Sequence, residues 1–203
     1  TDEELREAEE ASESTADDDE VNDSVVVLAS GNLGVVYSTR RAERATMEEV
    51  EALFPGILDG LAQHEGVGFV MIRSEAQGPV IIGAEGRYYL EDDRVEGVNP
   101  LADFGPNAAA HLRRTDGFPD VPDLVINSFC DEANNEGAAF EELIGFHGGM
   151  GGYQTQPFLL YPSKFDVPDE ELVGAASVHH VLKGWLNQLD SGTSDDGRNG
   201  SNG

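Results

Sequence analysis

Short, uninterrupted apolar runs constrain the fold of this 203-residue chain more than any other feature of its sequence. The runs are rich in β-branched residues and lie at residues 24–30, 35–38, 67–73 and 123–129. A strand that is apolar on both sides must be covered on both faces of its sheet, which is typical of parallel sheets. Helical patterns separate the runs. The sequence therefore predicts an α/β fold with a mixed, mostly parallel sheet covered by helices.

Helical patterns and one hairpin fill the intervals between these strands. Thr46 begins a capping box with Glu49, so a helix should start there. Pro55 should break or kink that helix, because proline has no N–H to donate and its ring clashes with the preceding turn. A hairpin, a short helix and a long amphipathic helix are expected at residues 79–90, 107–114 and 168–189.

Composition divides the chain into three parts. Residues 1–24 hold twelve Asp or Glu against one Arg and have almost no apolar residues, which predicts a disordered acidic linker. Residues 190–203 are Gly, Ser, Asp and Asn with one Arg and one Thr, which predicts a disordered tail. The folded part should therefore span residues 25–189.

The net charge of the chain restricts the classes of molecule that it can bind. Twelve Lys and Arg stand against forty Asp and Glu, a formal net charge of −28. Such a surface repels phosphate backbones and anionic lipids, so we expect no nucleic-acid-binding patch. No apolar run approaches the roughly 20 residues of a membrane span, so we expect no membrane segment in this chain.

Two further features of the composition bear on the environment of the protein. Only Lys164 and Lys183 are lysines, and abundant carboxylates with scarce lysine are typical of salt-adapted, halophilic cytosolic proteins. An ordinary acidic protein with acidic tails is the alternative. Cys130 is the single cysteine, which excludes an intrachain disulfide and a cysteine-based zinc cluster.

One histidine stands out as a candidate for chemistry. His147 lies in GFHGGMGG, where glycines would let the backbone approach a ligand closely, so its imidazole could bind a metal or a phosphate. The alternative is a Gly-rich turn with an exposed histidine. Asp123 is open to two interpretations, catalytic residue or turn residue. The other histidines are interpreted as structural or surface residues: His64, His111, His179 and His180.

Several runs together resemble a known family. PDLVINSF, followed after a bend by GFHGGMGGYQTQPFLLYPSKF, resembles the C-terminal part of type I phosphodiesterase/nucleotide pyrophosphatase proteins of the alkaline phosphatase superfamily. The opening VVVLASGNLGVVY and the segment GFVMIRSEAQGPVIIG resemble a bacterial and archaeal branch of it. The resemblance covers about residues 25–189 and implies an alkaline-phosphatase-like α/β fold.

The resemblance also implies a chemistry. The family holds two divalent metal ions, usually zinc, and transfers a phosphoryl group through a Thr or Ser nucleophile. Its late histidine ligand sits in a Gly-His-Gly loop, and His147 is the matching position here. No Asp-His pair and no matching nucleophile are present. The resemblance therefore implies an incomplete domain that supplies His147, acts on a phosphate ester and is inactive without the upstream half of the same enzyme.

Two other interpretations stay open. The chain could be a non-enzymatic or degenerate acidic α/β interaction module. It could also be a complete enzyme whose ligands come from the histidines and from Asp23, Asp103, Asp116 and Asp123. The location of the protein stays open as well, either cytoplasmic or membrane-associated through upstream segments.

Overall fold

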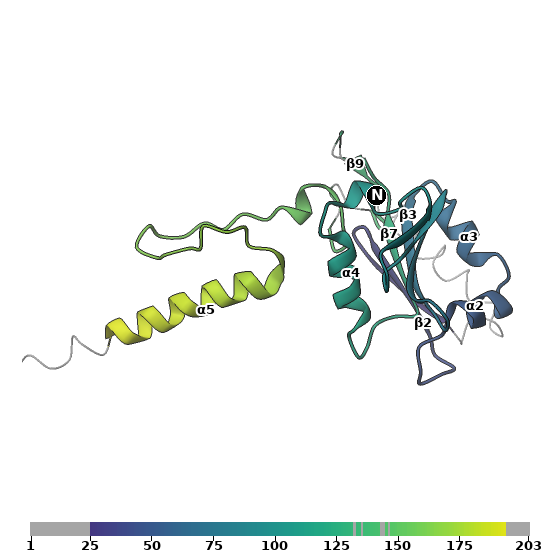
Figure 1. Cartoon of the computed structure of the whole chain (residues 1–203), viewed down its shortest axis with the longest axis horizontal. Coiled ribbons are helices and arrows are strands. Elements are labelled where there is room, and N and C mark those ends of the chain that lie inside the picture. The colour runs from purple at the N-terminus through teal and green to yellow at the C-terminus, as the bar shows by residue number, and fades with distance from the viewer. Residues whose placement is uncertain (1–24, 132, 135, 143–144, 146, 194–203) are drawn as a thin grey trace, which may run out of the picture. The chain divides into compact units, whose positions relative to one another are not determined.

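The computed structural model describes residues 25–131, 133–134, 136–142, 145 and 147–193 (Figure 1). The chain divides into two compact units, Thr1–Gln156 and Pro157–Gly203, and each is described by itself. The predicted acidic linker at residues 1–24 lies outside the described residues, as do residues 194–203 of the predicted tail. Among the described residues, no helix has both the length and the apolar character needed to cross a bilayer.

A seven-stranded sheet forms the centre of the first unit, with the order β1-β2-β7-β3-β4-β5-β6. Its strands are β1 (Val25–Ser30), β2 (Leu33–Ser38), β3 (Val67–Ser74), β4 (Gly78–Gly83), β5 (Gly86–Tyr89), β6 (Arg94–Gly97) and β7 (Leu124–Ser128). Every neighbouring pair in this sheet is antiparallel. A separate two-stranded sheet pairs β8 (Cys130–Asp131) with β9 (Glu136–Gly137).

Helices follow the signals in the sequence. In the described part of the first unit, the helices are α2 (Met47–Leu53), α3 (Ile57–Ala62) and α4 (Ala108–Asp116), with the 3-10 turns η2 (Ala102–Phe104) and η3 (Gly152–Thr155). The predicted capping box is confirmed: the Thr46 side chain accepts from the N–H of Glu49, whose carboxylate accepts from the N–H of Thr46. The predicted break at Pro55 is also confirmed, since α2 ends before this residue and α3 begins after it.

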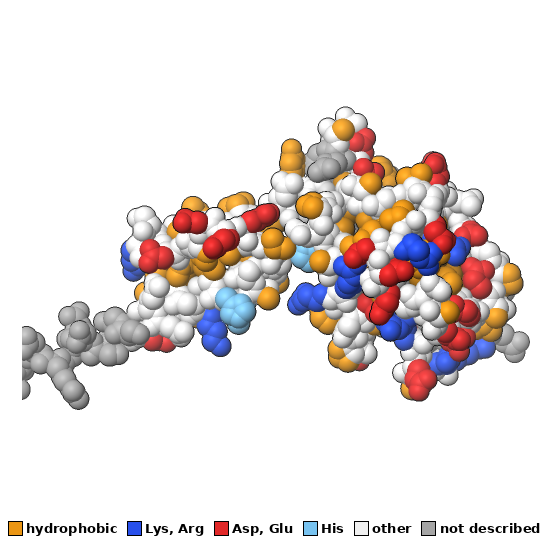
Figure 2. Space-filling view, viewed as in Figure 1, with side chains coloured by type: hydrophobic (Ala, Val, Ile, Leu, Met, Phe, Trp, Pro, Cys, Tyr) orange, Lys and Arg blue, Asp and Glu red, His pale blue; other side chains and the backbone are white. Residues whose placement is uncertain are grey.

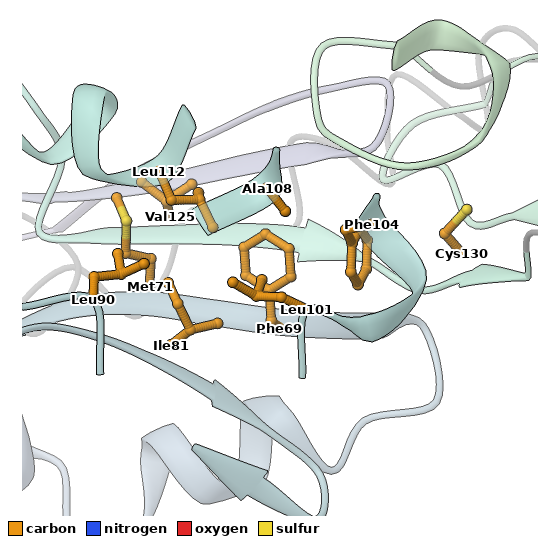
Figure 3. Close-up of a cluster of buried hydrophobic side chains, with 10 residues drawn as sticks. All are labelled: Phe69, Met71, Ile81, Leu90, Leu101, Phe104, Ala108, Leu112, Val125 and Cys130. Atoms are coloured by element: carbon orange, nitrogen blue, oxygen red, sulfur yellow. The ribbon is translucent and has the colours of Figure 1, made fainter. Parts of the chain in front are cut away.

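Helices cover both faces of the sheet. In Figure 1, α2 and α3 lie on one side of the strands and α4 lies on the other. The side chains of β3 alternate between the two faces, as they must in a strand. Phe69 and Met71 join the cluster toward α4, whereas Val70 and Ile72 join the cluster toward α3. The α4 cluster (Figure 3) comprises Phe69, Met71, Ile81, Leu90, Leu101, Phe104, Ala108, Leu112, Val125 and Cys130.

The expected parallel, alkaline-phosphatase-like sheet is wrong. The strands are antiparallel, yet helices on both faces bury both sides of the central strands, and this produces the uninterrupted apolar runs. The helices α2 and α3 do connect two parallel strands, β2 and β3, because each of these is antiparallel to β7. However, β7 lies between them, so the crossover does not build a parallel pair.

The second unit is built around one tryptophan. Trp185 of α5 (Gly174–Thr193) stacks on Phe165 and packs against Tyr161, and its Nε1 donates to the carbonyl oxygen of Asp166 at 2.8 Å. The helix begins later than the predicted residues 168–189 and includes the first residues of the predicted tail. The apolar residues 157–162 form no strand, and Phe158 and Leu160 are exposed.

Candidate functional site

The loop that carries His147 packs against the turn between β1 and β2. The N–H of Asn32 in this turn donates to the carbonyl oxygen of His147 at 2.8 Å. Gly31, the preceding turn residue, has a φ of +57°, and a Cβ added there would overlap the main-chain oxygen of His147. Glycine is therefore required at position 31 both by its conformation and by the loop that contacts it.

Asn32 binds this loop through its side chain. It is fully buried, its Oδ1 accepts from the N–H of Gly149 at 2.8 Å, and its Nδ2 donates to the carbonyl oxygen of Met150 at 3.0 Å. Its own carbonyl oxygen accepts from the N–H of Ser128 in β7 at 3.0 Å. One asparagine thus joins the β1–β2 turn, the loop and β7 through main-chain and side-chain hydrogen bonds.

A second buried asparagine, Asn127 of β7, holds the same loop. Its Oδ1 accepts from the N–H of Met150 at 2.7 Å, and its Nδ2 donates to the carbonyl oxygen of Met150 at 3.1 Å. A Cβ at Gly149 would lie 2.5 Å from that Oδ1 and 2.8 Å from the carbonyl oxygen of Asn32. At Gly149, the close backbone approach that we expected toward a ligand is therefore made to the protein itself.

His147 itself is exposed at the start of this anchored loop. Its carbonyl oxygen accepts the hydrogen bond from Asn32, and its Nδ1 faces Gly31, 2.7 Å from the position that a Cβ would take there. Sequence reasoning missed Asn32, which bonds His147 and the residues after it, and Asn127, which bonds Met150 in the same loop. One signal was available for Asn127, because asparagine is depleted in strands and this one interrupts the apolar run of β7.

The described residues do not form a metal centre on their own. Among them, no group of three or more His, Cys, Asp or Glu residues could hold a metal ion. A catalytic zinc ion needs about three protein ligands. The described residues therefore do not, by themselves, fit a two-metal site.

Two of the four aspartates considered as ligands of a complete enzyme bind other groups of the protein. Both carboxylate oxygens of Asp123 accept main-chain hydrogen bonds, from Ser38 and Ala45, so this residue holds the chain after β2. Asp116 forms ion pairs with Arg44 and Arg73. The remaining two are Asp103, which is exposed on η2, and Asp23, which lies outside the described residues.

The other four histidines lie at other positions in the described structure. His64 is exposed and its Nδ1 accepts from the N–H of Gly66 at 3.0 Å. His111 is partly buried in α4. His179 and His180 are exposed neighbours on α5, with rings in edge-to-face contact at 5.8 Å.

A polar hollow of about 480 Å³ lies between the end of β3 and the start of β4. The carboxylate of the neighbouring residue Glu48 accepts from the Ser74 hydroxyl at 2.7 Å and from the Glu75 N–H at 3.0 Å. Partial desolvation of its carboxylate raises the pKa of Glu48, but these hydrogen bonds outweigh that effect and hold the pKa below its usual value. The lining is mostly acidic and polar, with Arg73 already paired to Asp116, and His147 is not part of it.

Comparison with models of known protein families, with curated proteins and with solved structures gives no match for this chain.

Proposed function

We propose that this chain is the C-terminal part of a metal-dependent phosphoric-ester hydrolase of the phosphodiesterase/nucleotide pyrophosphatase type, to which it supplies His147. The proposal is carried by one observation: His147 is an exposed residue on a backbone that is anchored to the β1–β2 turn and to β7. The resemblance of the GFHGGMGG run to the family loop supports it. The antiparallel sheet does not, so the proposal depends on the site and not on the fold.

The anchored loop suits a metal ligand for a physical reason. A ligand whose backbone is already ordered loses less conformational entropy when it binds a metal than one on a free loop. The two metal ions, zinc by the resemblance, would supply charge that stabilises the transferring phosphoryl group. His147 would hold one of them, and Asn32 and Asn127 would keep its loop in position. The other ligands and the nucleophile would come from an upstream half.

Hydrolysis by the protein produced from its complete reading frame tests the proposal. With bis-p-nitrophenyl phosphate and added zinc or manganese, in low and molar salt, we expect His147→Ala to lose more than the roughly 10- to 100-fold that removal of an outer-shell partner costs. His180→Ala, an exposed histidine on α5, is the matched control and should keep its activity. The 203-residue chain alone should be folded by circular dichroism and inactive.

Two results would contradict the proposal. Activity of the complete protein that is unchanged by His147→Ala would remove the role of this imidazole. Hydrolysis by the 203-residue chain alone would show that its own residues complete the site.

A non-enzymatic interaction module is the second candidate. It is favoured by Gly149, whose lack of a side chain is explained by its packing against Asn127 and Asn32 without any ligand. A complete protein that folds and binds no zinc in calorimetry would support this candidate over the first.

A further inference from the structure

The helix α5 carries exposed leucines in addition to the tryptophan that it buries. Trp185 is 9% exposed and packs against two aromatic rings of its own unit. Leu182, Leu186 and Leu189 are 42%, 60% and 44% exposed. Residues three and four apart lie on one side of a helix, so these three form a continuous leucine stripe. The stripe is apolar surface beyond the one that Trp185 packs into the second unit.

The spacing of the leucine stripe is that of a helix–helix contact. Leu182 and Leu186 are four residues apart, and Leu186 and Leu189 are three apart. Apolar residues that alternate at spacings of four and three recur every seven residues and stay turned toward one partner helix. The helix α5 runs without a break from Gly174 to Thr193, so the stripe is presented on one straight element (Figure 1).

Two other occupants of the leucine stripe fit the chemistry poorly. Helices that lie on a membrane surface are rich in Lys and Arg, whereas α5 has Lys183 and no arginine. An anionic lipid surface would also repel a chain with a net charge of −28. Residues 194–203, which follow the helix, include no apolar side chain that could pack on leucines.

The charges beside the leucine stripe match a second copy of the same helix. Lys183 and Asp190 are exposed and lie two turns apart, on the side of the stripe away from Trp185. If a second α5 lies antiparallel, Lys183 of each copy faces Asp190 of the other. In the same register, Leu186 of each copy faces Leu189 of the other. A two-fold axis makes each of these contacts twice, which is typical of homodimers.

A parallel pair of helices does not give this match. There the residues that flank an apolar seam meet partners five positions away in the other helix. Lys183 would lie beside Val178 of the second copy, and Asp190 would lie beside Trp185 of the second copy. No ion pair would form between the copies. The order of charges along α5 therefore favours the antiparallel arrangement.

We infer that α5 is a dimerisation helix, whose leucine stripe packs antiparallel against the leucine stripe of a second copy of this chain. The two Lys183–Asp190 ion pairs between the copies fix the direction and the register, and the leucines supply the buried apolar surface. The inference does not depend on the proposed function. The negative charge of each copy opposes association over long distances, and salt weakens this repulsion more than it weakens contacts of a few ångströms.

Sedimentation equilibrium of the 203-residue chain tests the inference. In about 0.3 M KCl, we expect a monomer–dimer equilibrium with a dissociation constant on the order of 100 µM or lower. Leu186→Gln should raise this constant at least about tenfold, because each dimer loses two buried leucines. Leu160→Gln is the matched control: Leu160 is 89% exposed in the same unit but lies outside α5, so the constant should stay within about twofold.

Exchange of the two charges tests the direction and the register. Lys183→Asp and Asp190→Lys should each raise the dissociation constant about fivefold or more, because each turns two attractive pairs into repulsive ones. The double variant, which carries both changes, restores opposite charges between the copies. Its dissociation constant should return to within about twofold of the wild-type value.

Tryptophan fluorescence shows whether the second unit stays folded in these variants. Trp185 is the single tryptophan of the chain and is buried in this unit, so its emission reports on that packing. We expect the same emission from every variant. A chain that stays monomeric up to about 500 µM, at which an equilibrium of this strength would be mostly dimer, would overturn the inference. So would a dimer that Leu186→Gln leaves unchanged, or a double variant as weak as the single ones.

Discussion

The side chains of Asn32 and Asn127 are buried, and both form hydrogen bonds to the Gly-rich loop. Buried amides must find partners, and here each donates to the same carbonyl oxygen, that of Met150. Their oxygen atoms accept from two successive N–H groups of the loop, Gly149 and Met150. This pairing leaves no room for a side chain at Gly149, and it explains a glycine that the sequence alone associates with ligand binding.

Replacement of Gly149 tests this packing. Gly149→Ala should destabilise the protein by about 2–4 kcal/mol, because the new Cβ would collide with the Asn127 oxygen and break the buried hydrogen bonds. Gly60→Ala on α3 is the matched control, since a Cβ there meets no atom within 4 Å and alanine favours helix by up to about 1 kcal/mol. Urea unfolding of both variants provides the measurement. Equal stability of the two would contradict this role of the asparagines.

Short-range sequence signals determine where several helices and strands of this chain form. The capping box at Thr46 and the break at Pro55 place α2 and α3 where the sequence predicts them. The apolar runs at residues 67–73 and 123–129 become β3 and β7. Strand direction was not predictable from these runs, because helices bury both faces of an antiparallel sheet here and produce the pattern usually given by parallel sheets.

The contact between α2 and the end of β3 should depend on pH. Glu48 accepts two hydrogen bonds there, which hold its pKa below its usual value. A lowered folded-state pKa gives stability that is present above the unfolded pKa of about 4.3 and is lost as the pH falls through the folded value. Because Glu48 is exposed, we expect Glu48→Gln to cost at most about 1 kcal/mol at pH 7.

Thermal unfolding between pH 2 and pH 7 measures this difference. The wild-type protein and Glu48→Gln should differ at pH 7 and converge toward the acid end of this range, where the carboxyl group is protonated. Glu65→Gln, which also removes one exposed carboxylate, is the control for net charge. A difference that persists unchanged at pH 2 would refute the assignment to these hydrogen bonds.

The large negative net charge affects the stability of the whole molecule. Figure 2 shows carboxylates interspersed with arginines on the visible face of the sheet unit. With a net charge of −28, however, most carboxylates have no cation to balance them. Their mutual repulsion opposes the compact state, and salt screens it.

The melting temperature should therefore rise with salt. Screening shortens the range of electrostatic interactions from about 10 Å at 0.1 M to about 3 Å at 1 M. Scanning calorimetry in KCl and in NaCl should show the same rise in both, since screening depends on ionic strength and not on the ion. A melting temperature that stays flat between 0.1 and 2 M would contradict the salt-adapted interpretation and favour an ordinary acidic protein.

By itself, the sequence determined the places of α2, α3, β3 and β7 and which histidine stands on a Gly-rich loop, because capping, proline and apolar runs act over a few residues. Only the tertiary structure decided that β7 lies antiparallel between β2 and β3, that β1 is the terminal strand of its sheet, and that Asn32 and Asn127 meet at the loop. Strands pair through main-chain groups that all residues except proline share, so neither their order nor their direction is encoded in any single run.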